Sequence, residues 1–203
     1  MIAILTADII NSRKLPSQKW MDDLKVFLSQ FGKTPNDWEI YRGDEFQLEI
    51  KNPEEALLIA FQIKAFFKSI RLDVRMSIGF GSKTYKSKKI TESNGTAFIR
   101  SGEKFENLKK QKINLIVNSN DSLFDEELNL ILKLSLSFMD NWLQQSATFI
   151  LVAIQNPTAT QEEIGFKLGI NQAAVSRRQK RSNYELVLQV DRYFRKKIKT
   201  LTA

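Results

Sequence analysis

The side chains that could perform chemistry in this chain are carboxylates, hydroxyls and cations, because its 203 residues include no Cys and no His. Without these two types there is no disulfide, thiolate metal site, cysteine nucleophile or Ser-His-Asp triad. A bound metal would therefore be an oxygen-preferring ion such as Mg²⁺, Mn²⁺ or Ca²⁺. Three carboxylates stand out: Asp8 in an apolar run, and Asp44 and Glu45 in a turn between two strand-like runs.

Short apolar runs alternate with helical patterns over the first 120 residues and predict the elements that position these carboxylates. Predicted strands cover residues 2–10, 38–41, 46–50, 74–81 and 113–117, and predicted helices cover residues 16–31, 52–67 and 94–110. The order β-α-β-β-α-β-α-β favours a ferredoxin-like α+β sheet with one added unit. In that topology the first and third strands are antiparallel neighbours, so Asp8 should lie beside the turn that holds Asp44 and Glu45.

Three carboxylates at one sheet edge repel one another, so raised pKa values, a basic neighbour or a divalent cation must compensate. Mg²⁺ held by one or two carboxylates and by substrate phosphates is common in phosphoryl-transfer sites. The alternative is that Asp44 only belongs to a hairpin turn and that Asp8 is a solvated strand end.

Several segments resemble known families, in the same order along the chain. Arg42-Gly43-Asp44-Glu45-Phe46 matches four of the five positions of the GGDEF signature turn. Thr6-Ala7-Asp8-Ile9-Ile10 is similar to the first-strand metal motif of class III nucleotidyl cyclases, and Met76-Ser77-Ile78-Gly79 to their Ser-Ile-Gly strand. Over the whole chain the sequence resembles SatD-like bacterial proteins, through Asp8-Ile9-Ile10-Asn11-Ser12-Arg13 and Gly95-Thr96-Ala97-Phe98-Ile99-Arg100.

The resemblance implies a palm-like domain of the nucleotidyl cyclase type that binds a nucleotide with Mg²⁺ or Mn²⁺. Carried over residue by residue, the metal ligands would be Asp8, the carbonyl of Ile9, Asp44 and Glu45. The residues implied for nucleotide binding are Arg42, Gly43 and Lys104, where glycine would let the backbone approach a phosphate and the cations would offset its charge.

Two departures from the family pattern bear on the activity. Arg42 replaces the first Gly of GGDEF, and the residues that read guanine in diguanylate cyclases have no clear counterpart between Asn11 and Asp37. Synthesis of cyclic-di-GMP is therefore not expected. The resemblance leaves a nucleotide-binding palm, with or without a chemistry of its own.

The C-terminal part is more basic and has a different pattern. Residues 138–203 hold 10 basic and 5 acidic side chains, and residues 171–199 hold 9 and 2. Helices are predicted over Glu126–Ser137 and Phe138–Gln155, ahead of a pair of shorter helices. Thr160 and Glu163 have the spacing of a capping box, and Gly169 suits the left-handed end of a helix.

The second helix of this pair should begin after Asn171, with Val175 as its inward anchor. Helix, Gly-containing turn and helix together resemble the helix-turn-helix of bacterial regulators and of sigma-factor region four. The positions suited to major-groove reading and phosphate contact are Gln172, Ala173, Ser176, Arg177, Arg178, Gln179, Lys180 and Arg181. The alternative is a plain pair of antiparallel helices.

Together these patterns predict a palm domain over residues 1–120 and an all-α helix-turn-helix domain over residues 121–203. The expected function is a DNA-binding regulator whose palm senses a nucleotide or metal ion. The alternatives are a metal-dependent nucleotidyl transferase or cyclase-type enzyme with an accessory helix-turn-helix, and a scaffold that binds only protein.

Double-stranded DNA and a second copy of the chain are the expected partners, and the leucine-rich helix is either the dimer seam or packs onto the palm. No stretch of about 18 apolar residues predicts a membrane span. Residues 1–10 carry Asp8 and lack a basic start, so we expect a buried strand there rather than a signal peptide, and a cytoplasmic protein.

Overall fold

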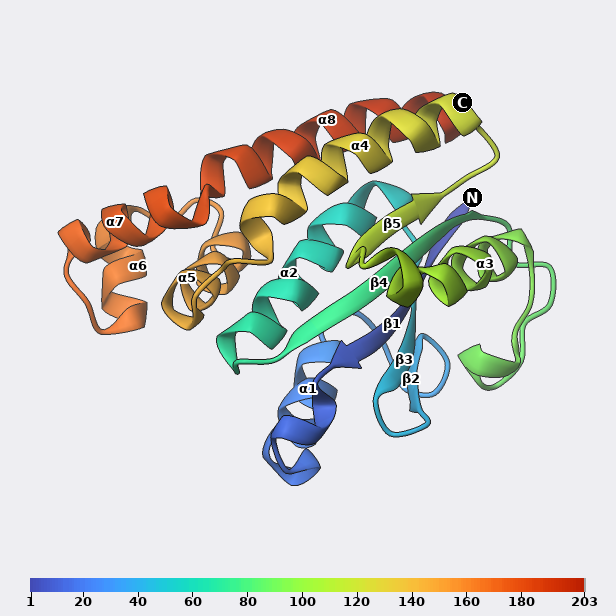
Figure 1. Cartoon of the computed structure of the whole chain (residues 1–203), viewed down its shortest axis with the longest axis horizontal. Helices are drawn as coiled ribbons and strands as arrows, with labels where there is room; N and C mark the ends of the chain where they lie inside the picture. Colours follow the sequence, from blue (N-terminus) through green and yellow to red (C-terminus); the bar gives the residue numbers. More distant parts are fainter. Residues whose placement is uncertain (203) are drawn as a thin grey trace.

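The fold is α+β. The computed structural model describes residues 1–202, apart from the side chains of Lys109 and Thr202, and over these residues it has one five-stranded mixed sheet and eight α-helices (Figure 1). The strands are β1 (Ile2–Ile10), β2 (Trp38–Tyr41), β3 (Glu45–Ile50), β4 (Asp73–Gly81) and β5 (Leu115–Asn118). They lie in the order β2-β3-β1-β4-β5, and all neighbours are antiparallel except β4 and β5, which are parallel.

The helices are α1 (Met21–Leu28), α2 (Ala56–Ser69), α3 (Thr96–Gln111), α4 (Ser122–Met139), α5 (Gln144–Gln155), α6 (Gln161–Leu168), α7 (Gln172–Ser182) and α8 (Tyr184–Thr202). Helix α3 covers one face of the sheet and α2 the other, and the helices from α4 to α8 lie further out on the side of α2 (Figure 1). Alternation along β1 directs Leu5 into the main core with α1 and α2, whereas Ile4 packs with Phe98 of α3 on the other face. Ser101 of α3 donates to the hydroxyl of Thr6 at 2.8 Å, which fixes α3 on that face.

The predicted strands are confirmed to within two residues at each end, and so is the predicted cap of α2. Asn52 accepts from the backbone N–H of Glu54, and Pro53 follows it in a short 3-10 turn that leads into α2. The helix predicted from Pro16 is shorter than expected. Its α-helical part begins at Met21, after a 3-10 turn over Ser17–Lys19.

The helix predicted over Phe138–Gln155 is confirmed only from Gln144 onwards, because α4 continues to Met139 and the chain turns a corner before α5 begins. Two polar contacts account for the corner. The carboxylate of Asp140 pairs with the ammonium of Lys64, and the indole N–H of Trp142 donates to the carbonyl of Ser182 at 2.9 Å. Leu143 is extended (φ −73°, ψ 156°) and starts a new helix in a new direction.

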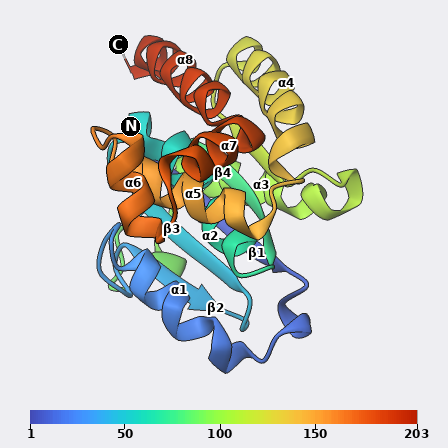
Figure 2. The ribbon, with the colours of Figure 1, turned by 90° about the vertical axis from the view of Figure 1, so that its left-hand side faces the viewer.

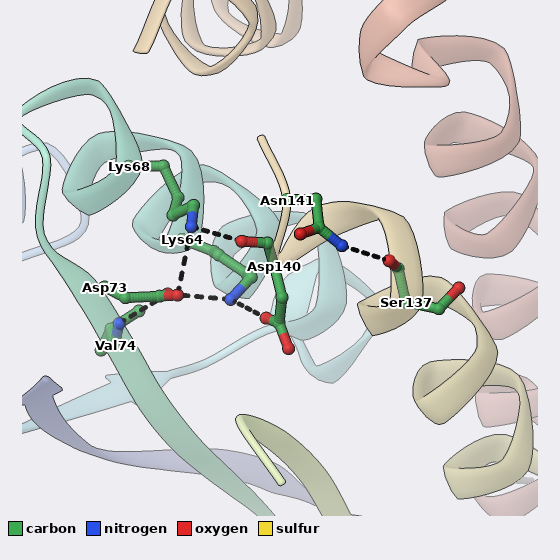
Figure 3. Close-up of polar contacts among 7 residues, drawn as sticks. All are labelled: Lys64, Lys68, Asp73, Val74, Ser137, Asp140 and Asn141. Carbon is green, nitrogen blue, oxygen red and sulfur yellow. Dashed lines mark hydrogen bonds and ion pairs between the residues drawn. The ribbon is translucent and has the colours of Figure 1, made fainter. Parts of the chain in front are cut away.

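An ion network centred on the buried Lys64 lies at this corner, where the sheet region meets the helical region (Figure 3). Lys64 of α2 has no exposed side-chain surface and pairs with Asp73 at 2.9 Å and with Asp140. Lys68, one turn further along α2, donates to the second oxygen of Asp73 at 3.4 Å and to the backbone carbonyl of Asp140. Two cations and two carboxylates thus balance one another, as burial of charge requires.

One hydrophobic core joins the two regions. It runs from β1 to α8, and Phe80 of β4 contacts both Phe124 of α4 and Phe194 of α8, with ring centroids 6.4 and 5.8 Å apart. Leu128 and Leu132 point into this core, so α4 packs onto the sheet region. None of the helices in the described part of the chain is long and apolar enough to span a membrane.

Candidate functional sites at the sheet edge and on α7

The predicted carboxylates meet at one edge of the sheet. In the pairing of β1 with β3, Asp8 lies opposite Glu45, and the backbone N–H of Ile9 donates to the carbonyl of Asp44 at 3.0 Å. The topological expectation that Asp8 and the turn before β3 lie together is therefore confirmed. The side chain of Ile9 itself points into the core and is 2% exposed.

Each of the three carboxylates has a partner within the protein. Asp8 pairs with the guanidinium of Arg75 at 2.9 Å, and Arg75 is also its register partner on β4. Asp44 accepts from the hydroxyl of Ser12 at 2.8 Å, while Glu45 lies 3.8 Å from the guanidinium of Arg42. Basic neighbours thus supply part of the compensation that the clustered charges need.

A raised pKa at Glu45 is the second way in which the repulsion between the clustered carboxylates is relieved. Partial burial raises the pKa of this carboxyl, the guanidinium of Arg42 opposes the shift, and the negative charges of Asp8, Asp44 and Glu106 add to it. The neighbouring Tyr41 responds to the same environment, since burial and the charge of Glu45 raise its pKa to about 12.

A pocket of about 510 Å³ opens at this edge, and half of its lining residues come from the segment that follows β1, residues 11–14. It is lined by Asp8, Ile9, Asn11, Ser12, Arg13, Lys14, Asp44 and Arg75. Of the residues implied for nucleotide binding, Arg42 and Gly43 form the turn beside Asp44 without lining the pocket. Gly43 has a φ of 86°, a conformation that favours glycine. Lys104 does not line the pocket. Its positive charge instead opposes the rise that burial causes in the pKa of Asp125 in α4.

Two of the three carboxylates, Asp8 and Asp44, line this pocket. Among the described residues, no three acidic side chains lie close enough together to form a metal-binding group. Asp8 and Asp44 do line one pocket, and Mg²⁺ is commonly held by one or two carboxylates with the remaining ligands from phosphates and water. The chemistry such an ion would supply is neutralisation of phosphate charge.

Sequence reasoning missed Arg75, the side chain that balances Asp8. An arginine between Val74 and Met76, inside a largely apolar strand, was the available signal. A cation at such a position needs a carboxylate partner or a bound anion, so the strand pattern alone could have drawn attention to it.

The second candidate site is the pair of helices α6 and α7 (Figure 2). Thr160 and Glu163 form the predicted capping box, and Gly169 ends α6 with a φ of 64°. Asn171 caps α7 by accepting from the backbone N–H of Ala174 at 2.9 Å, and Val175 is completely buried. All four local predictions are confirmed, and the short turn between the helices follows from them.

The predicted contact residues of α7 divide into two sets. Gln172 and Gln179 are engaged within the protein: both amides bond to Gln161 of α6, at 3.3 and 2.9 Å, and Gln179 also donates to Glu185 at 2.8 Å. Ser176 and Arg178 are half-buried. Gln172 is itself exposed, and the other exposed residues of α7 are Ala173, Arg177, Lys180 and Arg181.

The cations of α7 and α8 differ in their partners. On α8, Arg195 pairs with Asp191 at 2.7 Å, Lys197 pairs with Glu127 at 2.7 Å, and Lys199 pairs with Glu54 at 3.4 Å. Over residues 1–202, no carboxylate forms an ion pair with any of the four cations of α7, which are Arg177, Arg178, Lys180 and Arg181. The positive charge of α7 is therefore not balanced by neighbouring carboxylates.

A comparison with models of known protein families gives no match, and a search of curated proteins finds no similar sequence.

Proposed function

We propose that this protein is a DNA-binding regulator, in which α6 and α7 form a helix-turn-helix and α7 enters the major groove. The observation that carries the proposal is the exposed face of α7, whose cations lack carboxylate partners while those of α8 mostly have them. Arg177 and Arg181 suit guanine edges or phosphates, and the small Ala173 permits close approach to the groove.

The sheet region would then be the sensor. Its strand order, with β4, β1, β3 and β2 as neighbours, is the order expected of a ferredoxin-like palm, and this supports the resemblance to nucleotidyl cyclases and SatD-like proteins. The ligand we propose for its edge is a nucleotide, with Mg²⁺ or Mn²⁺ held by Asp8 and Asp44. Glu45 and the carbonyl of Ile9 are further candidate ligands.

A polar route connects the two regions and favours sensing over simple tethering. Lys68 contacts the carbonyl of Asp140 at the α4–α5 corner, and two residues later Trp142 donates to the carbonyl of Ser182, at the end of α7. These contacts join α2 of the sheet region to the C-terminal end of α7, and we propose that a change at Lys68 is transmitted to α7 along them.

DNA binding is tested by fluorescence anisotropy with duplex DNA over a range of salt concentrations. For about 4–6 phosphate contacts, log K should fall with log salt with a slope of roughly −4 to −5. Absence of binding at low salt, or a slope near zero, would exclude the proposal.

The alternative, a metal-dependent nucleotidyl transferase, has one observation in its favour: Asp8 and Asp44 line the same pocket. Nucleoside triphosphates incubated with the protein and Mg²⁺ or Mn²⁺, followed by chromatography of the products, separate the two. A regulator leaves the nucleotides intact. Turnover that stops in both Asp8→Asn and Asp44→Asn would favour the enzyme.

We also propose that the regulator is a homodimer whose two copies meet through α4. Leu123, Leu130 and Leu134 form one exposed stripe along this helix and are 76%, 61% and 64% exposed. If two α4 helices pair antiparallel about Leu130, Glu127 of one copy, which also pairs with Lys197 of its own chain, faces the basic Lys133 of the other, since each lies three residues from Leu130.

Sedimentation equilibrium tests the dimer. Leu130→Glu should convert it to a monomer, whereas Val26→Glu, a matched change of another exposed apolar residue on α1, should not. A wild-type protein that is monomeric at all concentrations, or an equal response of the two variants, would contradict the α4 contact.

A further inference from the structure

A second pocket of about 450 Å³ adjoins the sheet-edge pocket and shares Asn11 and Arg75 with it. Cations from three other places in the chain reach this pocket. Lys68 comes from the last turn of α2, Arg71 from the turn between α2 and β4, and Lys112 from the turn between α3 and β5. None of these three residues was singled out by the sequence patterns.

The pocket contains more positive charge than the protein balances. Asp73 is the acidic residue in its lining, and both oxygens of Asp73 are already engaged by Lys64 and Lys68 in the buried network (Figure 3). Arg75 is paired with Asp8.

Two cations remain without a carboxylate. Among residues 1–202, no carboxylate forms an ion pair with Arg71 or Lys112. Arg71 donates through its Nε to the neutral amide oxygen of Gln144 at 3.0 Å, and its terminal nitrogens have no hydrogen bond within the described residues. Over both pockets together, six cations line the sheet edge against three carboxylates.

We propose that this second pocket binds the phosphate chain of a small polyanion, a diphosphate or triphosphate group. Arg71 supplies a planar fork that matches two phosphate oxygens, Lys112 supplies a point charge, and the amides of Asn11 and Asn114 are neutral donors beside them. The chain of phosphates extends past Arg75 towards Asp8 and Asp44. The proposal names the ligand class of the proposed sensor and in that respect rests on the proposed function.

The test is isothermal titration calorimetry of the full chain with inorganic tripolyphosphate, in EDTA and at low salt. The first variant is Arg71→Gln with Lys112→Gln. The control is Lys86→Gln with Lys88→Gln, which removes the same charge from two exposed lysines in the loop after β4. We expect the dissociation constant to rise at least about tenfold in the first variant and less than about threefold in the control.

Equal effects of the two variants, or no heat of binding with the wild type, would overturn the proposal. Arg71→Ala with Lys112→Ala, checked by thermal unfolding, provides a second pair if the first does not fold. Because no DNA is present, failure of the helix-turn-helix proposal leaves this titration unchanged.

The same titration with each of four nucleoside triphosphates identifies the source of the phosphate chain. A nucleotide that binds at least as tightly as tripolyphosphate, and is lost in the same variant, makes the ligand a nucleotide. Binding of tripolyphosphate alone supports the pocket with a free polyphosphate as its ligand.

Discussion

Cations cluster both at the corner between α4 and α5 and on the exposed face of α7. Those at the corner are paired with carboxylates, whereas those on α7 are not paired within residues 1–202. At the corner, Lys64 is completely buried and pairs with two carboxylates. On α7, Arg177 and Arg181 are exposed and have no carboxylate partner among the described residues. Under the proposed function, the paired cations at the corner stabilise the fold, and the exposed cations of α7 are available to DNA.

The largest effect on stability should come from Lys64. Lys64→Met keeps the volume of the side chain but leaves Asp73 and Asp140 without their buried partner. Loss of one member of a buried ion pair costs about 3–5 kcal/mol. Urea denaturation should show a decrease of this size in the free energy of unfolding.

The matched control is Lys25→Met, which breaks an exposed pair with Asp22 on α1. Exposed pairs contribute about 0–1 kcal/mol, so this variant should unfold almost as the wild type does. Similar losses for the two variants would remove the distinction between balanced and unbalanced cations.

A smaller effect is expected at the sheet edge. Arg75→Met leaves Asp8 beside Glu45 without its guanidinium, and both members of the Asp8–Arg75 pair are partly exposed. We expect a loss of about 1 kcal/mol, less than for a buried pair because solvent screens the charges. Arg75→Lys should recover part of this loss in the same denaturation experiment, and a variant as stable as the wild type would count against the pairing.

The smallest effect concerns Glu45 and depends on pH. Partial burial and the charges of Asp8 and Asp44 raise the pKa of Glu45 in the folded state, so the folded protein binds this proton more tightly than the unfolded chain does. The stabilisation is present below the unfolded pKa and is lost as the pH rises through the folded pKa.

Glu45→Gln removes this titration. The variant and the wild type should therefore have similar stability near pH 3.5, and the variant should become the more stable of the two as the pH rises towards 7. Thermal unfolding at a series of pH values measures the difference. A difference that does not change with pH would show that Glu45 titrates as it does in the unfolded chain.

The sequence predicted the parts of the molecule that depend on local patterns. Thr160 with Glu163, Gly169 and Asn171 define the ends of α6 and α7 through backbone hydrogen bonds, and these need only a few neighbouring residues. The proximity of Asp8 to Asp44 also followed, because strand order restricts which strand ends can meet.

What the sequence could not provide were pairings between distant residues. Lys64 lies within an apolar helical pattern, and only the folded chain brings Asp140, 76 positions away, to its ammonium. For the same reason the patterns placed the break between these two helices after Ser137, whereas α4 continues to Met139 and α5 begins at Gln144. The engagement of Gln179 by Gln161 and Glu185 likewise depends on how three helices cross.

The proposed role of α7 is tested by two measurements on Arg177→Ala combined with Arg181→Ala, its stability and its affinity for duplex DNA. Because these cations are unbalanced, the free energy of unfolding should stay within about 0.5 kcal/mol of the wild type. The affinity for duplex DNA should fall about 30-fold or more, and the salt slope should lose roughly 2. The control, Lys86→Ala with Lys88→Ala, should change neither quantity appreciably. Unchanged DNA affinity in the α7 variant, or a loss shared equally by the control, would contradict the account.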